Sequence, residues 1–347
     1  MKKRVLKPLL LLLLALWGAP ARGQHLGQII DSLNRSSWYY TSWNNGWGGL
    51  IREWICQDLL HHMATEKQFI DFAQRRTWSA PLRLTAMRAL IDRRHPLCKA
   101  IVLHNMTDSS CVTVQSYDVI YSDYTQNMYV EWLMQGRGEG WLSVADSLEI
   151  DSAVLFTPAA ARLDYTRRLL RRLDTRPEYE PRVRQLYVSE HVAEALPLLA
   201  RYRREADKPL VTAALMQYAV GLDKKGAREP CKSPRGNYEG ATNEGLLAVR
   251  EWPDEDFKAA LLTVRDYEAR RHYYDYARIK YLFEALMAYD SPWAYRQIDR
   301  TLRMNRLNEY YRQYFHSAMK KHYNVRYQPL LNQWPYTPRN EFGDGFE

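Results

Sequence analysis

Helical periodicity constrains this chain more than any other feature. Apolar residues recur at the spacing that places them on one face of an α-helix along nearly all of its 347 residues. A strand-like pattern covers residues 111–121, and one short extended segment does not make a sheet. The sequence therefore predicts an all-α protein. We expect helices at 24–34, 50–64, 65–76, 82–94, 97–106, 122–135, 141–150, 158–174, 188–205, 209–223, 244–251, 254–271, 273–289, 292–303 and 306–322.

The amino terminus has the order of a secretory signal peptide. Basic residues precede an apolar run from Leu9 to Trp17, and small residues continue to Gly23. The run is about half of the ~20 apolar residues that a membrane-spanning helix needs. We therefore predict cleavage after Ala21 or Gly23, and an exported chain, periplasmic or extracellular, that is soluble and does not span a membrane.

Removal of this segment changes the charge balance. Five of the 49 basic residues, but none of the 40 acidic ones, lie in residues 1–23. The mature chain then has 44 basic residues against 40 acidic ones, a formal net charge of +4 instead of +9. So small an excess gives little support to nucleic-acid binding, and we predict no nucleic-acid partner.

Four cysteines remain after cleavage: Cys56, Cys98, Cys111 and Cys231. In an oxidising compartment an even number allows one or two disulfides, and the pairing stays open. A bond between Cys98 and Cys111 is disfavoured, because a helix and a loop separate them.

Composition divides the chain into successive segments. A Gly- and Pro-rich stretch marks the best candidate for a long exposed loop, and three prolines with an acidic end predict an irregular tail. The segments are the signal peptide (1–23), an N-terminal helix with an aromatic and Gly-rich loop (24–49), a helical repeat region (50–224), the exposed loop (225–243), a C-terminal helical repeat region (244–322) and the tail (323–347).

One unit, residues 79–108, carries a repeat signal. Ser79 and Pro81 open a helix whose residues 82–90 read LRLTAMRAL, and Pro96 begins its partner helix. Small Ala residues at this spacing let the two helices of a hairpin approach closely. The unit resembles a HEAT-like repeat.

Two echoes of this unit lie downstream. Ala285-Leu286 precedes Pro292 with the spacing by which Ala89-Leu90 precedes Pro96, and residues 198–200 precede Pro209 with one residue of slippage. The resemblance implies a right-handed stack of antiparallel helical hairpins, an α-solenoid that is irregular at both ends. A generic helical bundle is the alternative.

The densest aromatic cluster follows the first predicted helix. It contains Trp38, Tyr39, Tyr40, Trp43 and Trp47, interleaved with Asn and Gly. Flat rings beside amides can stack on a sugar and hydrogen-bond to it. The structural alternative is that these rings cover the open end of a repeat stack.

A basic band lies on the predicted helix 158–174. Arg167, Arg168, Arg171 and Arg172 share one face. They could hold an anionic polysaccharide, a lipid head group or an acidic protein. The alternative is a solvated face with local Asp and Glu partners.

The sequence contains none of the usual catalytic or metal-binding motifs. The chain has no nucleophile elbow, phosphate loop or zinc-protease motif. His95, Cys98, His104 and Cys111 match no usual zinc spacing. We therefore predict no catalytic residue, no metal and no cofactor.

We interpret the chain as an exported, non-enzymatic helical-repeat scaffold that binds a protein or glycan partner on its concave face. The alternative is an all-α carbohydrate-active enzyme, a glycosidase or lyase using two carboxylates from different helices. Its candidate carboxylates lie near aromatic residues: Asp123, Glu131, Glu244, Glu251 and Asp254.

The repeat interpretation makes a stability prediction. Replacing Ala86 with Leu should destabilise the mature protein by about 1–3 kcal/mol, because the larger side chain overpacks the contact between helices. Thermal unfolding of the two proteins measures this, and an unchanged melting temperature would contradict close packing of this helix.

Overall fold

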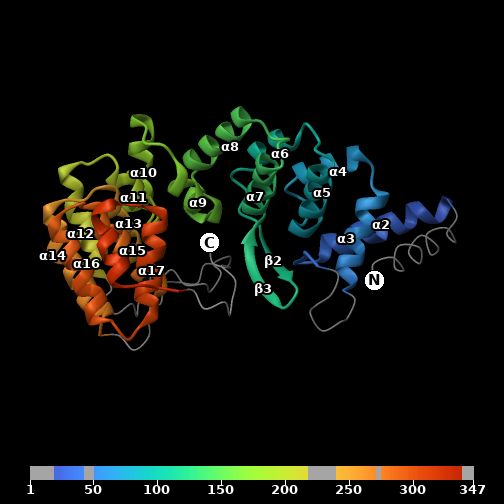
Figure 1. Cartoon of the computed structure of the whole chain (residues 1–347). Coiled ribbons are helices and arrows are strands. Elements are labelled where there is room, and N and C mark those ends of the chain that lie inside the picture. The colour runs from blue at the N-terminus through green and yellow to red at the C-terminus, as the bar shows by residue number, and fades with distance from the viewer. Residues whose placement is uncertain (1–18, 43–50, 218–239, 271–274, 338–347) are drawn as a thin grey trace. The chain divides into compact units, whose positions relative to one another are not determined.

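The computed structural model describes residues 19–42, 51–217, 240–270 and 275–337, which are mostly helical (Figure 1). These residues form two compact units: unit 1 runs to Thr166, and unit 2 begins at Arg167. The all-α prediction is confirmed at the level of a mainly helical chain. One small sheet in unit 1 departs from it.

Unit 1 centres on one buried helix. α5 begins after Ser79, whose hydroxyl accepts a hydrogen bond from Leu82 N, and Ala86 within it is fully buried. α5 packs against α2, α3, α4 and α7. Thr65 and Gln68 form a capping box at the start of α4. The helices of unit 1 are α2 (Ala19–Arg35), α3 (Arg52–Met63), α4 (Glu66–Gln74), α5 (Ala80–Asp92), α6 (Cys98–His104), α7 (Thr125–Gly138) and α8 (Val144–Phe156).

The sheet of unit 1 has three strands, β1 (Trp38–Tyr40), β2 (Cys111–Ser116) and β3 (Val119–Tyr124). β1 pairs in parallel with β2, which pairs antiparallel with β3. The expectation of an isolated extended segment was therefore wrong, as was the helix predicted to begin at residue 122. β1 is too short to show a pattern, and β3 has no alternation of buried and exposed residues that could have identified it.

Unit 2 is helical throughout its described residues. Its helices are α9 (Asp164–Arg172), which begins in unit 1, α10 (Glu180–Val188), α11 (Ala195–Ala200), α12 (Lys208–Met216), α13 (Gly240–Glu251), α14 (Lys258–Glu268), α15 (Tyr276–Ala288), α16 (Pro292–Met304), α17 (Glu309–Lys321) and α18 (Gln328–Gln333).

Two predictions in unit 2 were wrong. The single helix expected over 188–205 is instead the end of α10, a turn and α11, because His191 has a positive φ of 56° that a helix cannot continue. The tail after Tyr323 is not wholly irregular, since α18 forms there and Leu330 is fully buried. The predicted loop 225–243 lies mostly outside the described residues, and its last four residues belong to α13.

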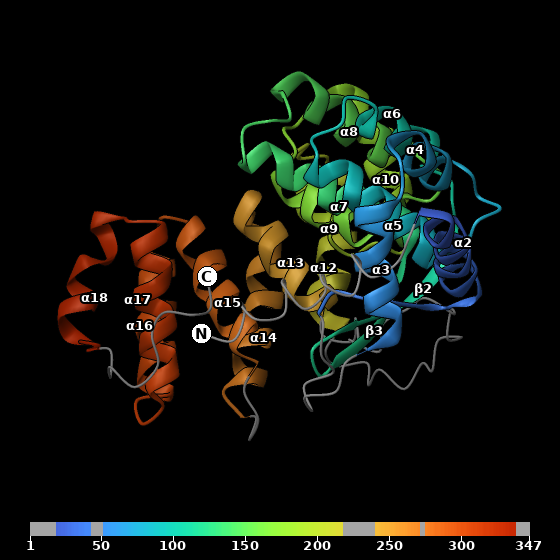
Figure 2. The same ribbon diagram turned by 90° about the vertical axis from the view of Figure 1, so that its right-hand side faces the viewer.

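Close contact between neighbouring helices builds the core of unit 2. α13 packs against α11, α12 and α15, and α15 packs against α16 and α17; Figures 1 and 2 show α13, α15 and α17 as neighbours. A Cβ atom added to Gly245 of α13 would lie 3.0 Å from Leu215 N of α12. The absence of a side chain at Gly245 therefore permits this close approach.

One backbone feature recurs where the sequence echoes lie. Arg94, Arg203 and Asp290 have φ values of 52°, 52° and 41°, and each follows the end of a helix: α5, α11 and α15. Arg94 and His95 donate to Ile91 O and Leu90 O, which is a Schellman motif. The three related stretches of sequence therefore share a left-handed helix end.

A second recurring feature was not predicted. Short 3₁₀ turns at 177–179, 205–207, 255–257 and 325–327 lead directly into α10, α12, α14 and α18. Pro is near the start of three of these helices, where its missing N–H costs no helical hydrogen bond.

A buried ion pair joins α5 to the segment before β2. Arg83 is fully buried and donates to Asp108, Asn105 and Ser110, and its guanidinium lies 5.9 Å from the ring centre of Tyr129. Burial acts to raise the pKa of Asp108, but hydrogen bonds from Arg83 and Ser110 outweigh it and hold this pKa below its usual value. Arg83 therefore satisfies a carboxylate that is only 4% exposed.

Loss of this pair should be costly. We expect Arg83→Met to destabilise unit 1 by about 3–5 kcal/mol, because it leaves the Asp108 charge buried and unpaired. The control is Arg75→Met, since Arg75 is 67% exposed in its pair with Asp71 and such pairs contribute about 0–1 kcal/mol. Urea unfolding compares the variants, and equal losses would contradict the role of Arg83.

Candidate functional site

The predicted arginine band of α9 contacts carboxylates elsewhere in unit 2. Arg171 donates to Glu244 Oε1 of α13 at 2.7 Å, and Arg167 lies 3.6 Å from Glu194. Arg168 and Arg172 are exposed but have partners of their own. At Arg167 and Arg171 the band therefore consists of ion pairs.

The pairing continues from helix to helix. Arg250 of α13 donates to Glu251 at 2.6 Å and to Glu284 of α15 at 2.7 Å. Arg201, just after α11, donates to Glu251 at 3.0 Å, and Lys321 Nζ of α17 lies 3.5 Å from Glu284. We call the residues of these contacts, together with the Arg171–Glu244 pair, the charged row: Arg171, Arg201, Glu244, Arg250, Glu251, Glu284 and Lys321.

Carboxylates lie beneath cations at both ends of the charged row. The side chains of Glu244 and Glu284 are 4% and 0% exposed, whereas those of Arg171 and Lys321 are 50% and 51% exposed. The row contains four cations and three carboxylates. A ligand approaching it would therefore meet positive charge, held in place by the acids below.

Glu244 shows how closely the two layers depend on each other. Burial raises its pKa, and Arg171 acts in the opposite direction. Its second oxygen, Oε2, is buried without a hydrogen-bond partner among the described residues. Tyr281 is half-buried, and burial raises its pKa. It lies close enough to the pair that Arg171 lowers this pKa and Glu244 raises it further. Arg171 is thus the main compensation for a buried acid.

In unit 1 the structure separates the predicted aromatic cluster. Tyr39 of β1 is buried, while Trp38 and Tyr40 on either side of it are half-buried, with ring centres 6.0 Å apart and planes 15° from parallel. Trp43 and Trp47 lie outside the described residues. Because side chains alternate along β1, the ring of Tyr39 lies in the core, and the parallel rings of Trp38 and Tyr40 lie on the other face.

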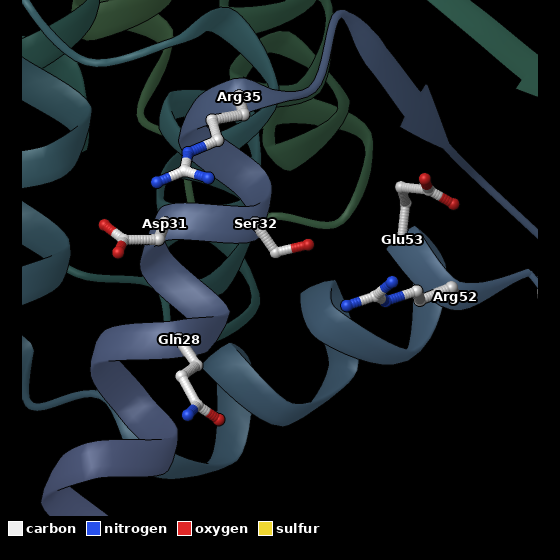
Figure 3. A pocket seen from close by; sticks show the side chains of 6 residues that line it. All are labelled: Gln28, Asp31, Ser32, Arg35, Arg52 and Glu53. Carbon is white, nitrogen blue, oxygen red and sulfur yellow. The ribbon is translucent and has the colours of Figure 1, made fainter.

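A polar hollow of about 410 Å³ lies between α2 and α3, close to β1 (Figure 3). Burial is the main cause of the raised pKa of Tyr40, and the charge of Glu53 raises it further. The two side chains are therefore near each other. No motif marks the residues of the hollow, and sequence reasoning did not select them. They are Gln28, Asp31, Ser32 and Arg35 of α2 and Arg52 and Glu53 of α3.

Two of the predicted carboxylates do come together. Asn127 Nδ2 of α7 lies 2.9 Å from an oxygen of Asp123 and 3.1 Å from one of Glu131. Burial raises the pKa of Asp123 to about 7, and the nearby Glu131 and Asp164 add to this effect. Asn127 also accepts a hydrogen bond from Tyr165 N at 3.1 Å. Its amide thus bridges the two acids.

The other candidate carboxylates have separate roles. Glu244 and Glu251 belong to the charged row, and Asp254 accepts a hydrogen bond from Asp256 N while lying 3.0 Å from Lys208. All three are therefore engaged in ion pairs of unit 2.

The residues with metal-binding chemistry in unit 1 are engaged in different ways. His95 lies 3.1 Å from Glu66, burial raises the pKa of Cys98 to about 12, and Cys111 is in a disulfide. Cys56 and Cys98 are free thiols, and Cys231 lies outside the described residues. Within those residues no three His, Cys, Asp or Glu side chains are placed to hold a metal ion.

In comparisons with known proteins, no family model, no curated protein and no solved structure matches this chain. None of the described helices combines the length and the apolarity that crossing a membrane requires. The function is therefore inferred from the residues and contacts above.

The buried acid Asp123 should make stability depend on pH. Its pKa is raised from 3.8 to about 7, so the folded chain holds this proton more tightly than the unfolded chain does. The stability that comes from this tighter proton binding is therefore lost as the pH rises from 3.8 to about 7. Relative to Asp123→Asn, which does not titrate, the wild-type protein should lose stability across this interval. Urea unfolding measured across this pH range tests this, and a constant difference between the two proteins would contradict it.

Proposed function

We propose that this chain is an exported, non-enzymatic helical-repeat scaffold that binds an acidic segment of a partner protein along the charged row of unit 2. The observation that carries the proposal is the layering of exposed cations over buried carboxylates at Arg171–Glu244 and Lys321–Glu284. The acids fix the cations in position before a ligand arrives, which lowers the entropy lost on binding.

A HEAT-like stack is supported by local features of the chain. α11, α13, α15 and α17 make contact in succession, and the left-handed residues Arg94, Arg203 and Asp290 recur at the sequence echoes. In a stack of hairpins, helices from successive repeats line one continuous surface. The charged row follows this succession from the end of α11 to α17, and Arg171 of α9 joins it through Glu244 of α13.

The spacing of helices favours an extended peptide. Packed helices lie about 8–10 Å apart, and an extended chain advances about 3.3 Å per residue. Cations on successive helices would therefore match acidic residues about three positions apart. Tyr281 is the single tyrosine ring that the described contacts bring to the row, and it has no stacked partner ring there among the described residues.

Two observations support export. The first residues have the order of a signal peptide. Cys111 is in a disulfide, a bond that persists in oxidising compartments.

A role without catalysis is supported by Asn127. A glycosidase needs open space between its two carboxylates for the sugar and, in inverting enzymes, for water. Here the Asn127 amide donates to both Asp123 and Glu131. This contact favours a structural link over a substrate site.

Binding of a fluorescent peptide with Glu at every third position tests the proposal. We expect Arg171→Gln and Lys321→Gln each to weaken binding by about tenfold, the effect of losing one contact of about 1.4 kcal/mol. Binding should also weaken with added salt, because the cations are exposed. Fluorescence anisotropy of the full mature chain measures both effects.

The matched control is Arg303→Gln on α16, because Arg303 is 60% exposed and paired with Asp299 outside the charged row. It should bind the peptide like the wild-type chain. Equal binding by all variants would overturn the proposal. So would binding of a sulfated polysaccharide, lost in the Arg171 and Lys321 variants, without any binding of the peptide.

A further inference from the structure

The hollow between α2 and α3 has a composition that the charged row does not share. Arg35 and Arg52 are donors, Asp31 and Glu53 are acceptors, and Gln28 and Ser32 can do both. Two cations and two carboxylates leave the hollow without formal net charge. It therefore suits a ligand that is rich in hydrogen-bonding groups but carries no charge.

The charged side chains of the hollow are not engaged in hydrogen bonds or ion pairs with the described residues. Within the described part of the chain, Asp31, Arg35, Arg52 and Glu53 form neither hydrogen bonds nor ion pairs with one another or with other side chains. Figure 3 shows the Arg52 side chain running from the start of α3 in the direction of α2. Four charged side chains in one concave place thus remain available to a ligand.

Aromatic surface lies next to this hollow. β1 follows α2 after two residues, so Trp38 comes soon after Arg35, and the Tyr40 side chain is near Glu53. The two rings are nearly parallel and half-buried, and neither Trp38 Nε1 nor Tyr40 OH bonds to a described residue. Half-buried parallel rings beside planar polar side chains offer both stacking and hydrogen bonding.

We propose that the hollow and the rings of Trp38 and Tyr40 form one binding site for a neutral oligosaccharide. The rings would stack on the C–H face of a sugar, while the polar side chains that line the hollow bind its hydroxyls. A charged ligand would gain from one pair of side chains and be repelled by the other. This site lies within unit 1 and does not depend on the proposed function of the charged row.

Isothermal titration calorimetry of the full mature chain tests this proposal. The probes are four soluble neutral oligosaccharides: the tetramers of β-1,4-linked glucose, α-1,4-linked glucose, mannose and N-acetylglucosamine. We expect at least one to bind, and Trp38→Ala and Arg52→Ala each to weaken that binding by at least about tenfold, as for other anchor residues.

Arg52 is exposed and free of described contacts, so Arg52→Ala keeps the test valid if Trp38→Ala disturbs the sheet. The matched control is Tyr323→Ala, which removes a ring that is 67% exposed in unit 2 and should leave sugar binding unchanged. All variants should still bind the acidic peptide, which separates the two proposals. Failure of all four sugars to bind, or equal binding by the wild-type chain and the Arg52 variant, would overturn the site.

Discussion

Burial of one helix's apolar face against its neighbours is the interaction on which this structure depends. α13 contacts α11, α12 and α15, and it approaches α12 so closely that a Cβ atom at Gly245 would lie only 3.0 Å from Leu215 N. In unit 1, α5 is likewise surrounded, with Ala86 fully buried. Contacts of this kind are possible only where small residues lie at the crossing points.

Helix packing also creates the polar features of both units. Arg171 and Glu244 are 73 residues apart in sequence, and they meet because α9 and α13 bring them together. The hollow in unit 1 arises in the same way, from polar residues on α2 and α3. Neither arrangement is a motif, since each depends on tertiary contacts between ordinary helix-surface residues.

Helices with strong end signals could be predicted from the sequence. Ser79 with Pro81 marks the start of α5, and Pro292 marks the start of α16; both helices form there. β3 and α18 could not be predicted in this way, because β3 is half-exposed without alternation and α18 is only six residues long. Their pairing or packing partners, not their local sequence, determine their conformation.

The same limit applies to the candidate sites. Periodicity predicted that Arg167 and Arg171 share a face of α9, but it could not reveal the carboxylates that pair with them. The aromatic cluster at 38–40 was apparent from composition, whereas only the register of β1 on β2 separates the buried Tyr39 from Trp38 and Tyr40. The sequence therefore showed which residue types are present, but not which residues they contact.

The most direct test of the central claim is hydrogen–deuterium exchange of the mature chain with and without the acidic peptide. If the charged row is the binding surface, the peptide should slow amide exchange in α13, α15 and the end of α17, where Arg250, Glu284 and Lys321 lie. Slower exchange confined to α14 and α16, or no change in unit 2, would contradict the account.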